Sequence, residues 1–201
     1  MIFRTLLLAG GLVSTIAASP SDAGPIFPFA GSVSDCNGQA CNRPFSGAFT
    51  VDPSVPDAFP GTPTAGGYAN AGTIELTFDD TDYDGNATYF VFDNDPVFGN
   101  AIGRSEADGF FIDAALIDAD NNDLDFIATL VGSDLDLFDD DALPTDVNQL
   151  AVASLDAANV TIQTGDETFQ GEINEIPEAG TVVLLASGLA GLAAARRRRR
   201  D

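Results

Sequence analysis

The sequence predicts an all-β protein with one antiparallel β-sandwich or jelly-roll-like domain, flanked by an N-terminal signal helix and a C-terminal transmembrane helix. Two observations predict the β domain. Short apolar or alternating stretches recur between turn signals at a spacing of about 8–12 residues, as in sandwiches. The 201-residue chain also contains 15 phenylalanines, which could fill the space between two packed sheets.

Residues 1–23 are expected to be a secretory signal peptide. Arg4 gives the positively charged start, Leu6–Ala18 is apolar, and Ser21–Ala23 offers small residues for cleavage after Ala23. The alternative is a buried first helix, but its glycines make that helix weak and Pro20 would end it.

Residues 24–175 are expected to form the acidic β-sandwich domain, and its first part, residues 24–72, to be rich in loops. This part is rich in Gly, Pro, Ser and Ala. Within it, Ser46–Val51 alternates as a strand does, and the prolines between Pro53 and Pro63 predict a long irregular connection.

From Thr73 onward the strand signals become regular. Thr73–Phe78 alternates apolar and polar residues, whereas Ala87–Phe92 is apolar on both faces and is expected to be a central strand. Asp146–Leu155 could form a helical turn. The other predicted strands are Phe110–Ile117, Leu124–Val131, Leu135–Phe138, and the hairpin Val160–Thr164 with Thr168–Ile173.

The only two cysteines, Cys36 and Cys41, are expected to form a disulfide bond if the chain is exported to an oxidising compartment. Their spacing is not that of a Cys-x-x-Cys redox motif. A metal site is also not expected, because the chain has no histidine and no further cysteine to complete it. We therefore interpret the pair as a structural crosslink.

The charge of the chain excludes several functions. Between Gly24 and Glu175 there are 28 carboxylates but only Arg43 and Arg104, so this region would repel a phosphate backbone and nucleic-acid binding is not expected. The absence of histidine and lysine removes Ser-His-Asp catalysis, phosphate-loop lysines and Schiff bases. Most of the acidic residues are explained by solubility in a saline environment.

One acidic segment has the pattern of a calcium loop. Asp80, Asp82 and Asp84 alternate before Gly85, and the backbone carbonyl of Asn86 would be the seventh-position ligand. The twelfth position holds a valine rather than a bidentate glutamate, which excludes a complete EF-hand. These residues are candidate Ca²⁺ ligands of weak affinity, and the alternative is a solvated turn.

The other acidic segments, Asp118–Asp125 and Asp139–Asp141, are expected to be polar loops. Paired carboxylates could hydrolyse glycosides, but with so many acids some pair will lie at the required separation by chance. The chain has no tryptophan and three tyrosines, so the usual stacking platforms for sugars are scarce. We expect no enzyme activity and no catalytic residues.

The C-terminal residues 176–201 have three parts. Ile176–Gly180 precedes the apolar segment 181–195, which is followed by a cluster of arginines. As a helix the 15 apolar or small residues would rise about 22 Å, somewhat short of the ~30 Å hydrocarbon core. Arginine side chains can extend to the interface and should remain on the cytoplasmic side. The residues expected to stop transfer through the membrane are Arg196, Arg197, Arg198, Arg199 and Arg200.

This arrangement resembles the PEP-CTERM sorting signal of Gram-negative bacteria. The matching positions are Pro177 and Glu178 in the motif, the apolar helix, and Arg196–Arg200, while Ala179 replaces the second proline of the motif. The order of an early Phe-Thr-Val-Asp segment, hairpins and a Phe-x-Gly-x-Ile strand before the motif is also similar to PEP-CTERM proteins of this size. The resemblance implies an exosortase-like membrane enzyme as partner, removal of the tail, and delivery to the cell surface or matrix.

The sequence therefore predicts a secreted, non-enzymatic surface or extracellular-matrix protein with a candidate Ca²⁺ site, anchored in the inner membrane before processing. One alternative function is an exopolysaccharide-binding module, and another is a small carbohydrate-active enzyme. A permanent single-span anchor is the alternative to tail removal.

Overall fold

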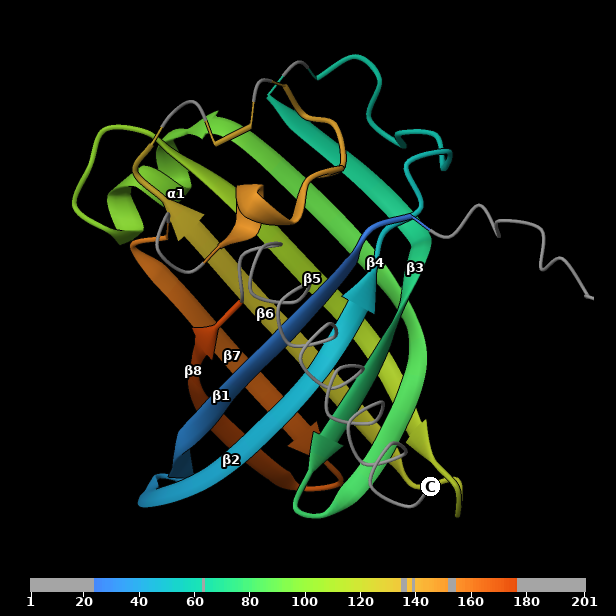
Figure 1. Cartoon of the computed structure of the whole chain (residues 1–201). Helices are drawn as coiled ribbons and strands as arrows, with labels where there is room; N and C mark the ends of the chain where they lie inside the picture. Colours follow the sequence, from blue (N-terminus) through green and yellow to red (C-terminus); the bar gives the residue numbers. More distant parts are fainter. Residues whose placement is uncertain (1–23, 63, 135–136, 139, 152–154, 177–201) are drawn as a thin grey trace, which may run out of the picture.

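The computed structural model describes residues 24–62, 64–134, 137, 138, 140–151 and 155–176. In this part of the chain eight antiparallel strands form a closed barrel, in which each strand pairs with the next and β8 pairs with β1 (Figure 1). The strands are β1 (Ile26–Cys36), β2 (Gln39–Thr50), β3 (Ala65–Phe78), β4 (Thr81–Asp95), β5 (Ala107–Asp118), β6 (Asp123–Gly132), β7 (Ala157–Thr164) and β8 (Glu167–Glu175).

The two ends of the barrel differ in their connections (Figure 1). At one end, the turn end, short turns join β1 to β2, β3 to β4, β5 to β6, and β7 to β8. At the other, the loop end, the chain makes longer connections after β2, β4 and β6. These contain the helix α1 (Pro96–Ala101) and the 3₁₀ helix η1 (Val147–Leu150). Asp95 caps α1 by accepting the backbone N–H groups of Val97 and Phe98.

Aromatic side chains fill the middle of the barrel. Because successive residues of a strand point to opposite faces, every second residue of each strand contributes to this core. Phe49 stacks on Phe27 with ring centroids 4.8 Å apart, and Tyr89 stacks on Phe110 at 5.4 Å. The hydroxyl of Tyr89 is satisfied inside the core, since it donates to the carbonyl of Thr50 at 2.6 Å. The interior of this small barrel is thus occupied by its own side chains, as is usual for eight strands.

Glycines make room for these rings in the first two strands. A Cβ atom built on Gly31 would lie 2.4 Å from the ring of Phe45, and one on Gly47 would lie 2.8 Å from the ring of Phe29. Each glycine therefore lies beneath a phenylalanine of the neighbouring strand. Such pairing of small and large residues allows a strongly curved sheet to keep a dense core.

The predicted sandwich is wrong, because the strands close into one barrel rather than dividing into two sheets. The pairing that closes it joins Gly31 to Ile173 and Cys36 to Phe169. The predicted alternation of apolar and polar residues is present, but a barrel and a sandwich both bury one face of each strand. No helix long and apolar enough to cross a bilayer occurs among the described residues. The predicted signal helix 1–23 and transmembrane helix 181–195 lie outside those residues.

The expectation of a loop-rich segment over residues 24–72 is also wrong for most of its length. It contains β1, β2 and the start of β3, and the irregular connection that its prolines predict is described over residues 51–62 and 64. The strands predicted from Thr73 onward are confirmed except the one over 135–138, where residues 137 and 138 are not in a strand. The helical turn expected within 146–155 is the 3₁₀ helix η1.

Ala87–Phe92 was expected to be a central strand because it is apolar on both faces. In the barrel, one of these faces is part of the core, and the other is partly covered by aromatic side chains from the loop end. Phe90 and Phe92 point outward from β4, where other aromatic rings partly cover them. Phe59, from the connection after β2, stacks on Phe90 at 6.5 Å, and Phe98 of α1 packs on Phe92 at 4.7 Å.

Candidate functional site

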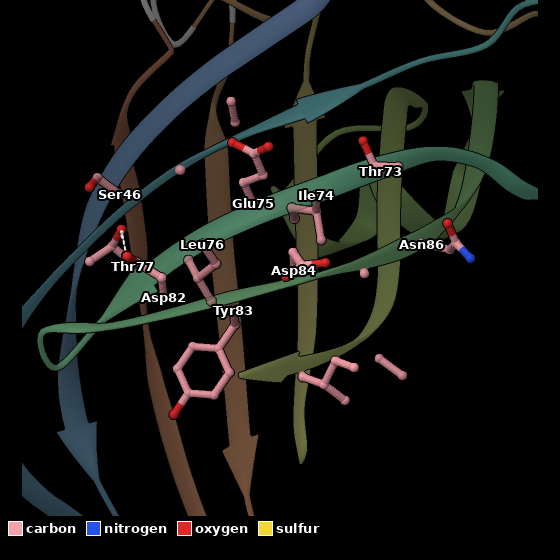
Figure 2. A pocket seen from close by; sticks show the side chains of 15 residues that line it. Ser46, Thr73, Ile74, Glu75, Leu76, Thr77, Asp82, Tyr83, Asp84 and Asn86 are labelled. Carbon is pink, nitrogen blue, oxygen red and sulfur yellow. Dashed lines mark hydrogen bonds between the residues drawn. The ribbon is translucent and has the colours of Figure 1, made fainter. Parts of the chain in front are cut away.

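Two adjoining hollows lie on the outer face of the barrel. The larger, of about 970 Å³, extends over β2, β3, β4 and β5 (Figure 2). The smaller, of about 440 Å³, extends from β1 to the β3–β4 turn. Both are lined by Ser46 and Thr77, so they form one groove across the strands, which we call the outer groove.

Strand register sets the side chains of the outer groove in rows. Ala48 on β2 lies opposite Glu75 on β3, which lies opposite Asp84 on β4, which lies opposite Ile117 on β5. This row has carboxylates in the middle and apolar side chains at its two ends. In Figure 2 the carboxylates of Glu75 and Asp84 project from the neighbouring ribbons of β3 and β4.

The next row toward the turn end is held by a hydrogen bond. Ser46, Thr77 and Asp82 are paired across β2, β3 and β4, and the hydroxyl of Thr77 donates to a carboxylate oxygen of Asp82 at 2.7 Å (Figure 2). The groove therefore offers carboxylates, hydroxyls and small apolar side chains on one exposed surface. Such a surface favours a ligand or segment that carries both positive charge and apolar groups.

The Glu75–Asp84 pair should lower the stability of the barrel, because like charges directly opposite in a sheet repel each other. We expect Glu75→Lys to stabilise the protein by about 0.5 kcal/mol at low ionic strength, since it replaces repulsion with an ion pair. Urea unfolding at about 10 mM and about 1 M salt checks this, because the gain should vanish at high salt. A gain that persists in high salt would contradict the electrostatic explanation.

The structure places the candidate calcium ligands in a hairpin rather than in a binding loop. Asp80 lies with Asp79 in the tight β3–β4 turn, where both have positive φ, 53° for Asp79 and 61° for Asp80. Asp82, Asp84 and Asn86 are alternate residues of β4 and are exposed. Alternate residues of a strand are about 6.7 Å apart, whereas ligands of one calcium ion converge to within about 2.5 Å of it.

Among the described residues, no group of three or more acidic, histidine or cysteine side chains is arranged to hold a metal ion. The structure thus brings Asp82 and Asp84 to the same face of β4, with Asp80 beyond the end of the strand. Calcium binding by Asp80, Asp82, Asp84 and Asn86 stays a prediction.

The acidic segment Asp118–Asp125 was expected to be a polar loop, but only residues 119–122 form a turn, because Asp118 ends β5 and Asp123 begins β6. One carboxylate oxygen of Asp118 accepts the backbone N–H groups of Asp120 and Asn122, and the other accepts the side-chain amide of Asn122 at 2.7 Å. The hydrogen bonds from Asn122 lower the pKa of Asp118. This carboxylate therefore organises its own turn, as expected for a polar loop.

Asp108 is a buried carboxylate that the sequence analysis did not single out. It lies at the loop end on β5 and is 0% exposed. Its two oxygens accept the backbone N–H groups of Asn94, at 2.8 Å, and Phe138, at 3.0 Å. Burial raises the pKa of Asp108, although these N–H groups oppose the rise. The strand pattern contains a signal for this position, because Asp108 falls in register with the inward-facing Phe110 and Ile112.

Arg43 closes the turn end of the core. Its guanidinium group lies 5.2 Å from the ring centroid of Phe169 and donates to Asp79 at 2.5 Å. The pair is half exposed, so its contribution to stability is small. Its main consequence is to connect β2 to the β3–β4 turn and to shield the aromatic core.

The predicted pairing of Cys36 and Cys41 is confirmed. The sulfur atoms are 2.05 Å apart, and the bond links the end of β1 to the start of β2. The turn between them is also fixed to β8, because the backbone N–H of Asn37 donates to the carbonyl of Thr168 and the side chain of Asn37 accepts the N–H of Thr168. The crosslink thus lies where β1 and β8 close the barrel.

We expect replacement of both cysteines by serine to lower the free energy of unfolding by about 2 kcal/mol, because the crosslink closes a short loop and limits the unfolded chain. Urea unfolding of the oxidised protein and the double variant measures the difference. Reduced wild-type protein serves as the control and should match the variant. Equal stability of the oxidised protein and the variant would show that the crosslink contributes nothing to the folded state.

The predicted C-terminal signal lies outside the described residues. This holds for the predicted sorting residues Pro177 and Glu178. It also holds for the predicted membrane-stop residues Arg196, Arg197, Arg198, Arg199 and Arg200. Their roles in sorting and in stopping transfer therefore stay predictions.

Comparison of the chain with protein-family models, with curated proteins and with solved structures finds no match.

Proposed function

We propose that the chain is an exported, non-enzymatic protein of the cell surface or extracellular matrix, delivered by a PEP-CTERM/exosortase-like system. The observation that carries the proposal is the Cys36–Cys41 disulfide bond, since such bonds persist in oxidising compartments outside the cytosol. It supports the export expected from the signal-like residues 1–23. The motif at Pro177 and Glu178 and the arginine cluster that follows support sorting by an exosortase-like enzyme.

The arrangement of the carboxylates supports a non-enzymatic protein. A carboxyl group with a raised pKa in a cleft is a candidate catalytic acid. The carboxyl groups of Asp108 and Asp93 have raised pKa values, but neither of them lines the outer groove. Asp108 is fully buried and both of its oxygens accept backbone N–H groups. It therefore serves the packing of the loop end rather than a substrate.

A binding module for an extracellular polysaccharide is the second candidate function, and the outer groove favours it. Hydroxyl, amide and carboxylate groups of β3 and β4 are set side by side there on the outward face of the sheet (Figure 2). Hydrogen bonds from such groups are a usual means of orienting a polar ligand such as a sugar. A glycan array probed with and without calcium tests this function, and a Thr77→Val variant that binds equally well would exclude the groove.

Intact-mass spectrometry of the protein from membranes and from culture supernatant tests the main proposal. We expect the supernatant form to lack residues 1–23 and the arginine cluster, and to be lighter by two hydrogen atoms because of the disulfide bond. Ala179→Pro restores the second proline of the motif and should increase the processed fraction. A variant with alanine at Pro177 and Glu178 should remain in the membrane fraction. Full-length protein in the cytosol, with both termini intact, would contradict the proposal.

A further inference from the structure

We propose that the outer groove binds the protein's own C-terminal segment, residues 181–200, when that segment is not in a membrane. The groove combines exposed carboxylates with small apolar side chains, and the segment combines 15 apolar or small residues with five arginines. This docking does not depend on sorting by any enzyme.

Charge complementarity is the first argument. Glu75, Asp82 and Asp84 are exposed in the groove, and Asp79 and Asp80 lie at its turn-end side. In the whole sequence, Arg196–Arg200 is the one cluster of positive charge, and Arg43 is already paired with Asp79. Opposite charges on a segment and a surface steer their encounter and fix the register of docking.

The apolar side chains of the groove are the second argument. Ile117 is 46% exposed, which makes it one of the few large hydrophobic side chains exposed on the described surface. It lies at the β5 end of the row that begins with Ala48, and Ala115 lines the groove next to it. A segment of alanine, leucine and valine laid across this row would remove its own apolar surface and that of Ile117 from water.

The position where the described chain ends is the third argument. Glu175, next to the last described residue, pairs with Ala30 of β1, and Ala30 pairs with Ser46 of β2. Ser46 begins the row described above, which continues through Thr77 to Asp82. The row spans four strand spacings, or about 19 Å. Residues 177–180 can extend about 13 Å, and the following 15 residues add about 22 Å as a helix. The segment therefore reaches the whole groove, and its arginines reach the carboxylates of β3 and β4.

Limited trypsin digestion of the purified full-length chain in detergent-free buffer tests the docking. Trypsin cleaves after arginine and lysine, and intact mass distinguishes loss of the tail at Arg196–Arg200 from cleavage at the lysines that the variants introduce. We expect the double variant Glu75→Lys with Asp82→Lys to lose the tail about tenfold faster than wild type at low salt, because cleavage follows the undocked population. Wild type should reach the same fast rate in about 1 M salt.

The matched control is the double variant Asp113→Lys with Asp166→Lys, which has the same change in charge at exposed residues that do not line the groove. It should keep the slow rate of wild type. Equal rates for wild type and the groove variant would overturn the proposal. Protection that decreases on dilution would also overturn it, because the tail would then bind a second copy. Urea unfolding of both variants confirms that each remains folded.

Discussion

Phe49→Ala is expected to lower the free energy of unfolding by about 3–5 kcal/mol, the usual cost of removing a buried phenylalanine. Phe49 is 0% exposed and lies at the centre of the aromatic core. Its ring is 4.8 Å from that of Phe27 and 6.0 Å from those of Tyr89 and Phe110. The rings of several strands therefore border the cavity that the alanine would leave.

Urea unfolding followed by near-ultraviolet circular dichroism measures this loss. Phe59→Ala is the matched control, because Phe59 is 46% exposed and stacks on Phe90 outside the barrel. We expect the control to cost about 1 kcal/mol. If both variants lost the same stability, the interior rings would not be the main source of cohesion between the strands.

Individual strands were predictable from the sequence because their period is local. In Thr73–Phe78 the apolar residues alternate with polar ones, and the structure buries Ile74, Leu76 and Phe78. The β7–β8 hairpin was predictable because its turn signal is also local. Gly165 has a positive φ of 58°, a conformation that glycine adopts readily and that the turn requires.

The closure of the barrel was not predictable in this way. It depends on pairing between β1 and β8, which are separated by most of the described chain. Only Ser46–Val51, at the end of β2, gave a strand signal before Thr73. The signals of β1 and of the rest of β2 were weak, and Gly31 and Gly47 interrupt the apolar pattern of these two strands. Phenylalanines of the neighbouring strand cover both glycines, and that cover is a tertiary effect.

The acidic pattern at residues 80–84 has two physical interpretations that one sequence does not separate. Alternating aspartates occur in a calcium loop, and they also occur on the exposed face of a strand. The structure places Asp82 and Asp84 on such a face. For Asp108, by contrast, the sequence does distinguish a buried from an exposed carboxylate. Asp108 is in register with the inward-facing residues of β5, so the alternation of that strand already predicts its burial.

Asp108→Ala is expected to lower the free energy of unfolding by about 4 kcal/mol at neutral pH. The variant leaves the backbone N–H groups of Asn94 and Phe138 without an acceptor, and each orphaned buried group costs about 1–3 kcal/mol. The loss should begin at the loop end, because Phe138 packs on Phe110 and holds the chain after β6 against the core. Asp108→Asn keeps one acceptor oxygen and should lose about half as much.

The pH dependence of the free energy of unfolding distinguishes an effect of the ionisable carboxyl group of Asp108 from a purely steric effect of the substitution. Burial raises the pKa of Asp108 in the folded protein above the value of 3.8 expected when unfolded. Between these two pKa values the folded state binds more protons than the unfolded state, so the contribution of Asp108 to stability falls as pH rises. The difference in stability between wild type and Asp108→Asn should therefore be larger near pH 4 than at pH 7.

Urea unfolding of wild type, Asp108→Asn and the exposed control Asp113→Asn at both pH values measures this effect. The control is necessary because neighbouring carboxylates also titrate, and the pKa of Asp93 is raised by burial and by the charge of Asp108. Asp113→Asn should show a difference from wild type that is small at both pH values. A difference for Asp108→Asn that is independent of pH would mean that the carboxylate is solvated in solution and that the N–H groups of Asn94 and Phe138 have other acceptors.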